Sequence, residues 1–315
     1  MIDKTPVRRI AIVGAGTIGG GFAAHFLSKG LEVHVTDPAP DGEAKVRAFV
    51  ARAWEQLREL GLAAAPKAPD FAFHKTVRAT VEAADFVQEN APETEALKVE
   101  VLAEIDAHLP PGKVIASSTS ALVLSRIAVK TKRPERCILA HPIHPPYLLP
   151  LMELAGGDRT DPEAVAFARA FYESVGLKPI TLKREVYGHI ANRLQYVIWN
   201  EAVRLVLQGY CTPEDVDTAV TYGPGMRWAF VGPFLTYALA GGEGGLKRTF
   251  EIFAPRDTMS TDRASRIQLT PEQRQQLIDG VEDMLNGRSM RDLAALRDER
   301  LMELIKLRRA KPPIL

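Results

Sequence analysis

The sequence predicts an α/β domain followed by an all-helical domain. In the first half of the chain, short runs of β-branched residues alternate with longer amphipathic stretches, which is typical of βαβ units around a parallel sheet. From residue 188 onward the pattern changes to long segments with apolar residues at helical spacing. At 315 residues the chain is also long enough for two domains of about 150 residues each.

The first domain is expected at residues 1–186. Two segments, residues 43–60 and 93–108, repeat apolar residues every three or four positions and are predicted to be helices between strands. Two later apolar runs, residues 151–154 and 178–183, could add strands after the main sheet. The strands of the main sheet are predicted at residues 9–13, 32–36, 85–89, 114–117 and 137–140.

The second domain, residues 187–315, is predicted to be all α-helical. The join near residues 184–188 does not resemble a flexible Gly/Ser linker, so we expect a packed domain interface, which is a preferred place for ligand sites. Helical periodicity is found at residues 189–208, 213–220, 233–253, 271–285 and 290–309.

Composition argues against several functional classes. Lys and Arg number 40 and Asp and Glu 39, so the strong positive charge of a nucleic-acid-binding protein is missing. No apolar stretch approaches the roughly 18 residues of a membrane span. Cys137 and Cys211 lie far apart and no signal peptide precedes the first strand, so we expect a cytoplasmic protein with a small-molecule partner, and neither nucleic acid nor membrane.

A glycine-rich motif follows the first predicted strand. Gly14, Gly16 and Gly19 have the G-x-G-x-x-G spacing. Gly14 permits a tight turn, Gly16 lets a pyrophosphate approach the backbone, and Gly19 lets the next helix pack closely on the strand. That helix begins near Thr17 and Ile18, where free N–H groups and the positive end of the helix dipole favour phosphate. The motif therefore predicts a Rossmann-type dinucleotide-binding domain.

Asp37 indicates which dinucleotide is bound. It follows Gly19 by 18 residues, at the end of the second predicted strand, where a carboxylate can accept hydrogen bonds from ribose hydroxyls. The same charge repels a 2′-phosphate, so we expect NAD rather than NADP. The alternative, glycines that serve only a tight turn in a nucleotide-free fold, does not account for Asp37.

Three further segments carry polar residues of the kinds used in catalysis. They are residues 117–120 (Ser-Ser-Thr-Ser), residues 141–146 (His-Pro-Ile-His-Pro-Pro) and residues 188–193 (Gly-His-Ile-Ala-Asn-Arg). In order and spacing these segments resemble the L-3-hydroxyacyl-CoA dehydrogenase superfamily, from about residue 8 to residue 253. The resemblance implies an NAD-dependent enzyme that oxidises an alcohol.

The resemblance also implies roles for individual residues. His141 would be the general base and Glu153 the carboxylate that orients it, while Ser117 and Asn192 would hydrogen-bond the substrate oxygen. These roles agree with the chemistry, because alcohol oxidation requires removal of a proton, and histidine titrates near neutral pH. A carboxylate on the second ring nitrogen fixes the tautomer and stabilises the imidazolium. The alternatives are a structural His141 and a plain polar turn at residues 117–120.

Two further residues, Glu89 and Lys98, match superfamily positions near the cofactor. His144 departs from the superfamily, which usually has Asn before the proline, and this leaves the substrate contacts near it open. We do not expect a metal pair of His141 and His144, because residues three apart in an extended segment point to opposite faces. No metal is predicted.

Residues 223–234 bear on the substrate. An Arg-aromatic-Ala-Phe insert, with Arg227, Trp228 and Phe230, precedes a Gly-Pro-Phe turn. The insert is similar to the carnitine dehydrogenase and lambda-crystallin (L-gulonate 3-dehydrogenase) branch and unlike enzymes that act on CoA thioesters. A guanidinium can bind a carboxylate, and aromatic faces can bind a quaternary ammonium. The resemblance implies oxidation of a small L-3-hydroxy acid to the 3-keto acid, with L-carnitine the first candidate.

Several alternatives stay open from the sequence. The substrate alternatives are L-gulonate and a 3-hydroxyacyl-CoA. A non-catalytic NAD-binding or structural protein, or a nucleotide-sensing regulator, would need none of the four residues assigned to catalysis. We also expect a homodimer formed through the helical domain, whose apolar-striped helices need a surface to cover them.

Overall fold

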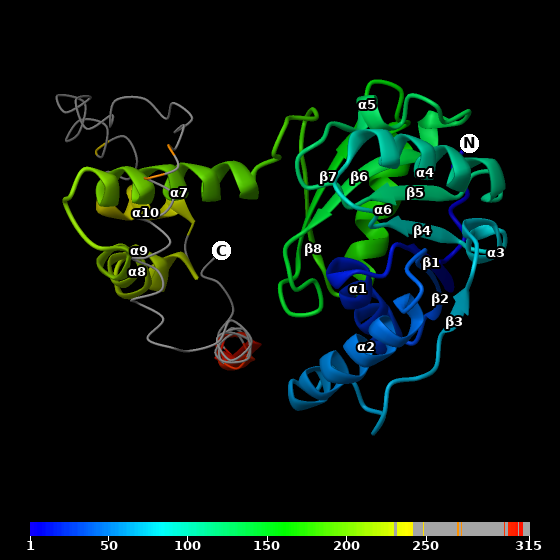
Figure 1. Cartoon of the computed structure of the whole chain (residues 1–315), viewed down its shortest axis with the longest axis horizontal. Coiled ribbons are helices and arrows are strands. Elements are labelled where there is room, and N and C mark those ends of the chain that lie inside the picture. Colours follow the sequence, from blue (N-terminus) through cyan, green and yellow to red (C-terminus); the bar gives the residue numbers. More distant parts are fainter. Residues whose placement is uncertain are drawn as a thin grey trace. The chain divides into compact units, whose positions relative to one another are not determined.

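The computed structural model describes residues 1–229, 232–241, 248, 270, 272, 299, 302–307 and 309–310. The chain divides into two compact units, Met1–Asn192 and Arg193–Leu315 (Figure 1). The predicted boundary at residue 186 lies in the loop before α7 (Ala191–Leu207), whereas the units divide just inside that helix.

The first unit is built on one eight-stranded sheet in the order β3-β2-β1-β4-β5-β6-β7-β8 (Figure 1). β1 to β6 are parallel, β7 runs antiparallel to β6, and β8 is parallel to β7. The order of the six parallel strands is that of a dinucleotide-binding sheet, which confirms the predicted fold class. The strands are β1 (Arg9–Val13), β2 (Glu32–Thr36), β3 (Ala72–His74), β4 (Phe86–Glu89), β5 (Val114–Ser117), β6 (Cys137–Pro142), β7 (Leu151–Gly156) and β8 (Lys178–Thr181).

Helices cover both faces of this sheet, as its parallel strands require. On one face, α3, α4 and α5 pack on a core that includes Leu102, Ile115 and Ile127. On the other face Phe86 of β4 packs against Phe171 of α6, with ring centroids 4.7 Å apart, and α1 packs against α2. The helices are α1 (Thr17–Ser28), α2 (Gly42–Glu59), α3 (Val77–Val81), α4 (Glu95–His108), α5 (Leu124–Ile127) and α6 (Pro162–Ser174).

β1, β2 and β5 have the bounds that the sequence predicts, and β4, β6, β7 and β8 differ from their predictions by one or two residues at one end. The two later apolar runs form β7 and β8 and extend the same sheet. The sequence reading missed β3, because three partly buried residues are too few to show the alternation of a strand. It also missed α6, although Asp161 caps this helix and Pro162 occupies its first turn, a recognisable start signal.

The described elements of the second unit are all helical, as predicted. They include α7, α8 (Pro213–Tyr222), α9 (Pro224–Trp228) and α10 (Pro233–Ala240), and residues 302–307 are also helical. Thr212 and Asp215 form a reciprocal capping box at the start of α8. Of the predicted helix at residues 271–285 only residue 272 is described, and most of the predicted helix at residues 290–309 lies outside the described residues.

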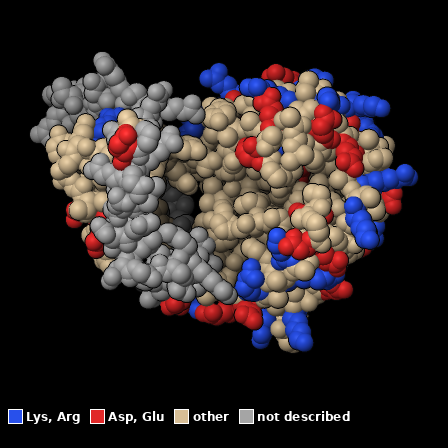
Figure 2. All heavy atoms as spheres, viewed as in Figure 1, with Lys and Arg blue, Asp and Glu red and all other residues tan. Residues whose placement is uncertain are grey.

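Positive and negative side chains are mixed on the surface (Figure 2), as expected for a chain with 40 basic and 39 acidic residues. Figure 2 shows acidic and basic residues interspersed over the visible face of the first unit. Several of them pair on the surface, such as Arg47 with Asp70 at 2.6 Å. Within the described part of the chain, no helix is long and apolar enough to cross a membrane.

Candidate active site

The first unit contains a cavity of about 1080 Å³ at the carboxyl ends of its parallel strands. It lies where the strand order reverses between β1 and β4, the point at which open α/β sheets bind their ligands. The loops after β1, β2, β4 and β5 and the end of β6 line this cavity. Its lining includes Gly16, Asp37, Glu93, Ser120 and His141.

The loop between β1 and α1 has the geometry that binds a pyrophosphate. Gly14 has a φ of +90°, and a Cβ there would lie 2.7 Å from a carbonyl of the loop after β4, so only glycine fits. A Cβ on Gly19 would lie 1.9 Å from the Gly14 oxygen, because α1 packs directly on the loop. Gly16 precedes α1 without a side-chain cap, and Thr17 and Ile18 line the cavity. The first amides of α1 are therefore available to an anion.

Asp37 stands in a fixed orientation at the end of β2. Its Oδ2 accepts the Ala15 amide at 2.7 Å and its Oδ1 accepts the Ala39 amide at 2.9 Å. The carboxylate therefore contributes a fixed negative charge to the cavity wall, where it can accept further bonds from ribose hydroxyls. The glycine loop and this carboxylate together fit NAD.

His141 and Glu153 face each other across the antiparallel pair of β6 and β7, in register. The Nδ1 of His141 donates to the Oε2 of Glu153 at 2.8 Å. His141 is 5% exposed and Glu153 0%. Residues opposite one another on antiparallel strands have neighbouring side chains, so a twelve-residue spacing becomes a direct contact. Glu153 therefore fixes the orientation of the His141 imidazole on the cavity wall.

The other oxygen of Glu153 is bound by backbone. Its Oε1 accepts the amides of Ile190 at 2.8 Å and Ala191 at 3.0 Å, at the start of α7. Burial raises the pKa of Glu153, but the hydrogen bonds from His141 and these two amides outweigh it and leave the pKa below its usual value. The carboxylate is therefore ionised when it binds His141.

The loop after β5 differs from the sequence-based expectation. Ser117 is completely buried and its hydroxyl donates to Glu89, and it is not among the described residues that line the cavity. Ser120, three residues further on, lines the cavity together with His141. The Nδ2 of Asn192 donates to the Ser120 carbonyl at 2.8 Å. The loop thus brings Ser120, and not Ser117, to the site.

Glu89 and Lys98 form a buried pair. The Nζ of Lys98 donates to Glu89 Oε1 at 2.9 Å, and both side chains are almost fully buried. Neither residue lines the cavity among the described residues, so they support the loop after β4 from within.

Glu93 is a site residue that the sequence reading missed. Its Oε1 accepts the hydroxyl of Thr119 at 2.6 Å and the amides of Ser120 at 3.0 Å and Ala121 at 2.9 Å. Burial raises its pKa, but these bonds and the nearby Lys98 leave the pKa below its usual value. The available signal was a Pro-Glu pair at the start of the helix predicted over residues 93–108, where a carboxylate often meets free backbone amides.

The substrate residues predicted near residue 230 belong to the second unit. Arg227 and Trp228 lie on α9 and are exposed. Phe230 lies outside the described residues. His144 is exposed in the loop between β6 and β7. Among the described residues no group of three potential metal ligands occurs.

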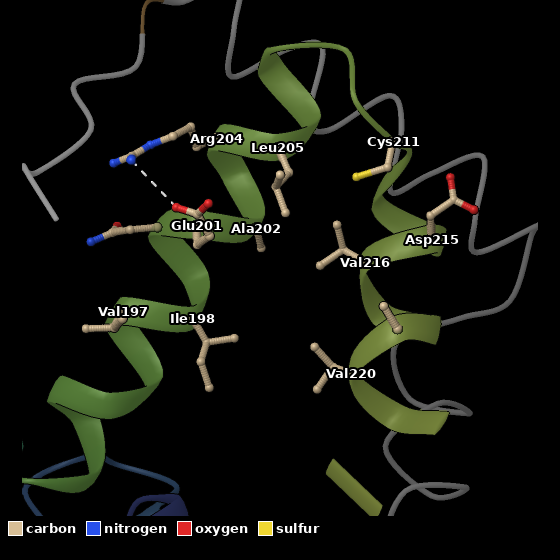
Figure 3. A pocket seen from close by; sticks show the side chains of 12 residues that line it. Val197, Ile198, Glu201, Ala202, Arg204, Leu205, Cys211, Asp215, Val216 and Val220 are labelled. Carbon is tan, nitrogen blue, oxygen red and sulfur yellow. Dashed lines mark ion pairs between the residues drawn. The ribbon is translucent and has the colours of Figure 1, made fainter. Parts of the chain in front are cut away.

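A second cavity, of about 520 Å³, lies within the second unit between α7 and α8. Figure 3 shows Val216 and Val220 of α8 directed toward α7, from which Ile198 and Leu205 point back. The lining is mainly apolar. Of its charged residues, Arg204 Nη1 lies 3.6 Å from Glu201 Oε2, and Asp215 is hydrogen-bonded to Thr212 at the start of α8. This cavity is a gap between helices and does not contain the polar groups of the first one.

Protein-family models match segments of both units. Residues 9–186 match the 3-hydroxyacyl-CoA dehydrogenase NAD binding domain, and residues 188–273 match the 3-hydroxyacyl-CoA dehydrogenase C-terminal domain. Among curated relatives, the L-carnitine dehydrogenase of Streptomyces coelicolor is 45% identical over 97% of this chain and 96% of its own. The L-carnitine dehydrogenase of Bacillus cereus is 43% identical over 97% of this chain and 94% of its own.

Solved structures agree with this placement. The 5-formyl-3-hydroxy-2-methylpyridine 4-carboxylic acid 5-dehydrogenase, described as an NAD⁺-dependent dismutase, is 30% identical with a TM-score of 0.81, covering 96% of this chain and 98% of its own. The (S)-3-hydroxybutyryl-CoA dehydrogenase of Ralstonia eutropha is 27% identical with a TM-score of 0.62, covering 79% and 86%. The fold and the cavity therefore define an NAD-dependent dehydrogenase that acts on a CH–OH group. The chain belongs to the 3-hydroxyacyl-CoA dehydrogenase family.

Proposed function

We propose that this protein oxidises the 3-hydroxyl of L-carnitine to the 3-keto acid with NAD as acceptor. The observation that carries the reaction type is His141 on the wall of the cofactor cavity, bound through Nδ1 to the buried Glu153. This leaves the Nε2 of His141 to take the hydroxyl proton. The substrate itself is supported by the similarity to L-carnitine dehydrogenases over nearly the whole chain.

The residues divide the work of the reaction. NAD, when bound, supplies the hydride acceptor. His141 takes the hydroxyl proton, and Glu153 keeps its ring in one tautomer and stabilises the positive charge. Ser120 is better placed than Ser117 to donate a hydrogen bond to the substrate oxygen, because Ser120 lines the same cavity as His141 and Ser117 is not among the described residues that line it. Asn192 contributes by binding the Ser120 carbonyl.

Substrate recognition is proposed to involve the second unit. The guanidinium of Arg227 can bind the carboxylate of a free hydroxy acid in a bidentate manner, whereas a thioester offers no such charge. Trp228 and Phe230 are the candidates for contact with a quaternary ammonium, which aromatic faces attract by about 0.5 to 2 kcal/mol.

Steady-state kinetics with one set of substrates test this proposal. We expect the highest kcat/KM for L-carnitine, above L-gulonate, 3-hydroxybutyrate and 3-hydroxybutyryl-CoA. Arg227→Ala should lower kcat/KM for carnitine about 10- to 100-fold, the loss of a charged hydrogen bond. Arg58→Ala, on the exposed face of α2, is the matched control and should have no effect. Preference for the CoA ester, insensitive to Arg227→Ala, would contradict the proposed substrate, and no NADH formation at all would favour a non-catalytic NAD-binding protein.

We also propose a homodimer, located in the cytoplasm. The helix α7 supports the dimer because it exposes large apolar side chains, with Trp199 59% and Tyr196 60% exposed. A chain that leaves such residues in contact with water gains from covering them with a second copy.

A further inference from the structure

The turn at residues 188–192, which includes the first two residues of α7, has an unusual backbone. Gly188 has a φ of 74° and His189 a φ of 49°, and His189 is the only non-glycine residue with positive φ in the described part of the chain. This conformation is sterically unfavourable for a residue with a side chain. His189 is also completely buried. A strained and buried residue persists only where its surroundings fix it, and such residues concentrate at functional sites.

One side of this turn binds the loop that carries Ser120. Three successive carbonyls of that loop accept hydrogen bonds from the turn. The Nε2 of His189 lies 2.9 Å from the Thr119 carbonyl oxygen, and the side-chain amide of Asn192 donates to the Ser120 carbonyl oxygen at 2.8 Å. The backbone amide of Gly188 donates to the Ala121 oxygen at 3.1 Å. The position of Ser120 therefore depends on the turn.

The other side of the turn binds the general base. The amides of Ile190 and Ala191 bind Glu153, which in turn binds His141. The ring of His189 also packs against the ring of His141, with centroids 5.0 Å apart and planes inclined by 51°. His189 thus contacts both the Ser120 loop and His141.

The ring of His189 acts as a neutral donor. Burial lowers its pKa, and the nearby His141 lowers it further, although the bond to Thr119 opposes this. A neutral imidazole has a single N–H. The shorter of its two contacts is that of Nε2 with Thr119, while Nδ1 lies 3.2 Å from the Val186 oxygen. We assign the hydrogen to Nε2, where it donates to the Thr119 carbonyl.

We propose that His189 is a positioning residue that fixes the separation between Ser120 and His141. Its Nε2–H anchors the Ser120 loop and its ring face supports the imidazole of the base. The inference rests on the proposed function in that it assigns Ser120 and His141 to the reacting hydroxyl. A displacement of about 1 Å between such groups can lower a rate 100-fold.

Two substitutions separate the two contacts. His189→Phe retains an aromatic ring against His141 but has no N–H for Thr119. His189→Asn tolerates a positive φ and so should fold, but it removes the ring. We expect kcat for carnitine to fall about tenfold in His189→Phe and about 100-fold in His189→Asn. The Kd for NAD should stay within about twofold, since the turn does not line the cofactor cavity among the described residues. His108→Phe, exposed on α4, is the control.

A readout without turnover keeps the inference separate from the proposed function. In ¹⁵N-labelled wild-type protein, His189 should show a slowly exchanging Nε2–H, and both substitutions should remove it and shift the ring signals of His141. Unchanged kcat in both variants, or unmoved His141 signals, would overturn the inference. So would a loss of kcat that merely parallels losses of Tm and NAD affinity, the pattern of a structural residue. Absence of turnover in the wild type would contradict the proposed function, while the His141 signals would still decide the role of His189.

Discussion

The role of His141 as a general base depends on its hydrogen bond to Glu153 and on the burial of both side chains. Glu153 is ionised because three hydrogen bonds compensate its burial, and it binds only one of the two ring nitrogens of His141. An imidazole held in this way presents a defined nitrogen to the substrate hydroxyl.

The first prediction concerns this histidine. His141→Gln should lower kcat about 10²- to 10⁴-fold, the usual contribution of a general base, because glutamine cannot take a proton. The Kd for NAD should change little, since the glycine loop and Asp37 are untouched. His108→Gln, the same substitution at an exposed position of α4, should leave kcat unchanged. Turnover near the wild-type level in His141→Gln would require another base.

His25 on α1 makes stability depend on pH in the first unit. Its ring is buried and contacts the Val175 oxygen at 3.0 Å. Burial lowers its pKa from 6.5 to about 3. Because the folded protein prefers the neutral ring, its contribution to stability is complete above pH 6.5 and is lost as the pH falls from there toward the folded pKa.

Urea unfolding at pH 7 and pH 5 measures this contribution. The loss that His25 causes between these values is about 2 kcal/mol by linkage of its two pKa values. His25→Gln keeps an N–H donor but cannot titrate, so its free energy of unfolding should fall by about 2 kcal/mol less than that of the wild type over the same interval. Equal losses in the two proteins would show that His25 takes its proton as easily in the folded state as in the unfolded chain.

Among the elements, the loop after β5 receives hydrogen bonds on both sides. Glu93 accepts its amides, while the turn at residues 188–192 donates to its carbonyls. A short loop without regular structure leaves its backbone groups to be satisfied by partners of this kind. Backbone amides and carbonyls of the loop are therefore hydrogen-bonded at the point where Ser120 lines the cavity.

Glu93→Ala should loosen this loop. It removes the acceptor of the Thr119 hydroxyl and of the Ser120 and Ala121 amides, and we expect kcat to fall about 10- to 100-fold through misplacement of Ser120. Glu95→Ala is the matched control, because Glu95 lies two residues away in the first turn of α4 and pairs with Arg126 at the surface. A kcat within twofold of the wild type in Glu93→Ala would show that the carboxylate does not set the geometry of the loop.

At the scale of the whole molecule, the chain combines a dinucleotide-binding sheet with a helical unit. The first unit supplies both the cofactor cavity and the His141–Glu153 pair. The loops after β1, β2, β4 and β5 and the end of β6 meet at the carboxyl ends of the parallel strands and line the cavity there. The helical unit contributes the exposed apolar surface of α7.

The dimer is the prediction at this scale. Light scattering at micromolar concentration should give twice the chain mass of 34.6 kDa. Trp199→Glu and Tyr196→Glu, on the exposed surface of α7, should shift the mass toward that of one chain, since a buried charge without a partner is costly. A wild-type mass of 34.6 kDa would refute the homodimer.

The sequence by itself determined the features that depend on local pattern. Apolar periodicity located most strands and helices, and the glycine spacing with Asp37 located the cofactor loop. The resemblance to a known family indicated that His141 and Glu153, twelve residues apart, form a hydrogen-bonded pair. Each of these signals lies within a few residues or a fixed spacing along the chain.

Only the tertiary structure decided which side chains of the loops face the cavity. The order of strands brings Glu93 to the amides of Ser120, and the closing turn brings His189 to His141, across separations that carry no periodic signal. The sequence does not show whether the side chain of Ser117, at the end of β5, points toward the cavity or into the protein. The side chain of Ser117 points inward, where its hydroxyl donates to Glu89, because the oxygens of a buried carboxyl group need hydrogen-bond partners.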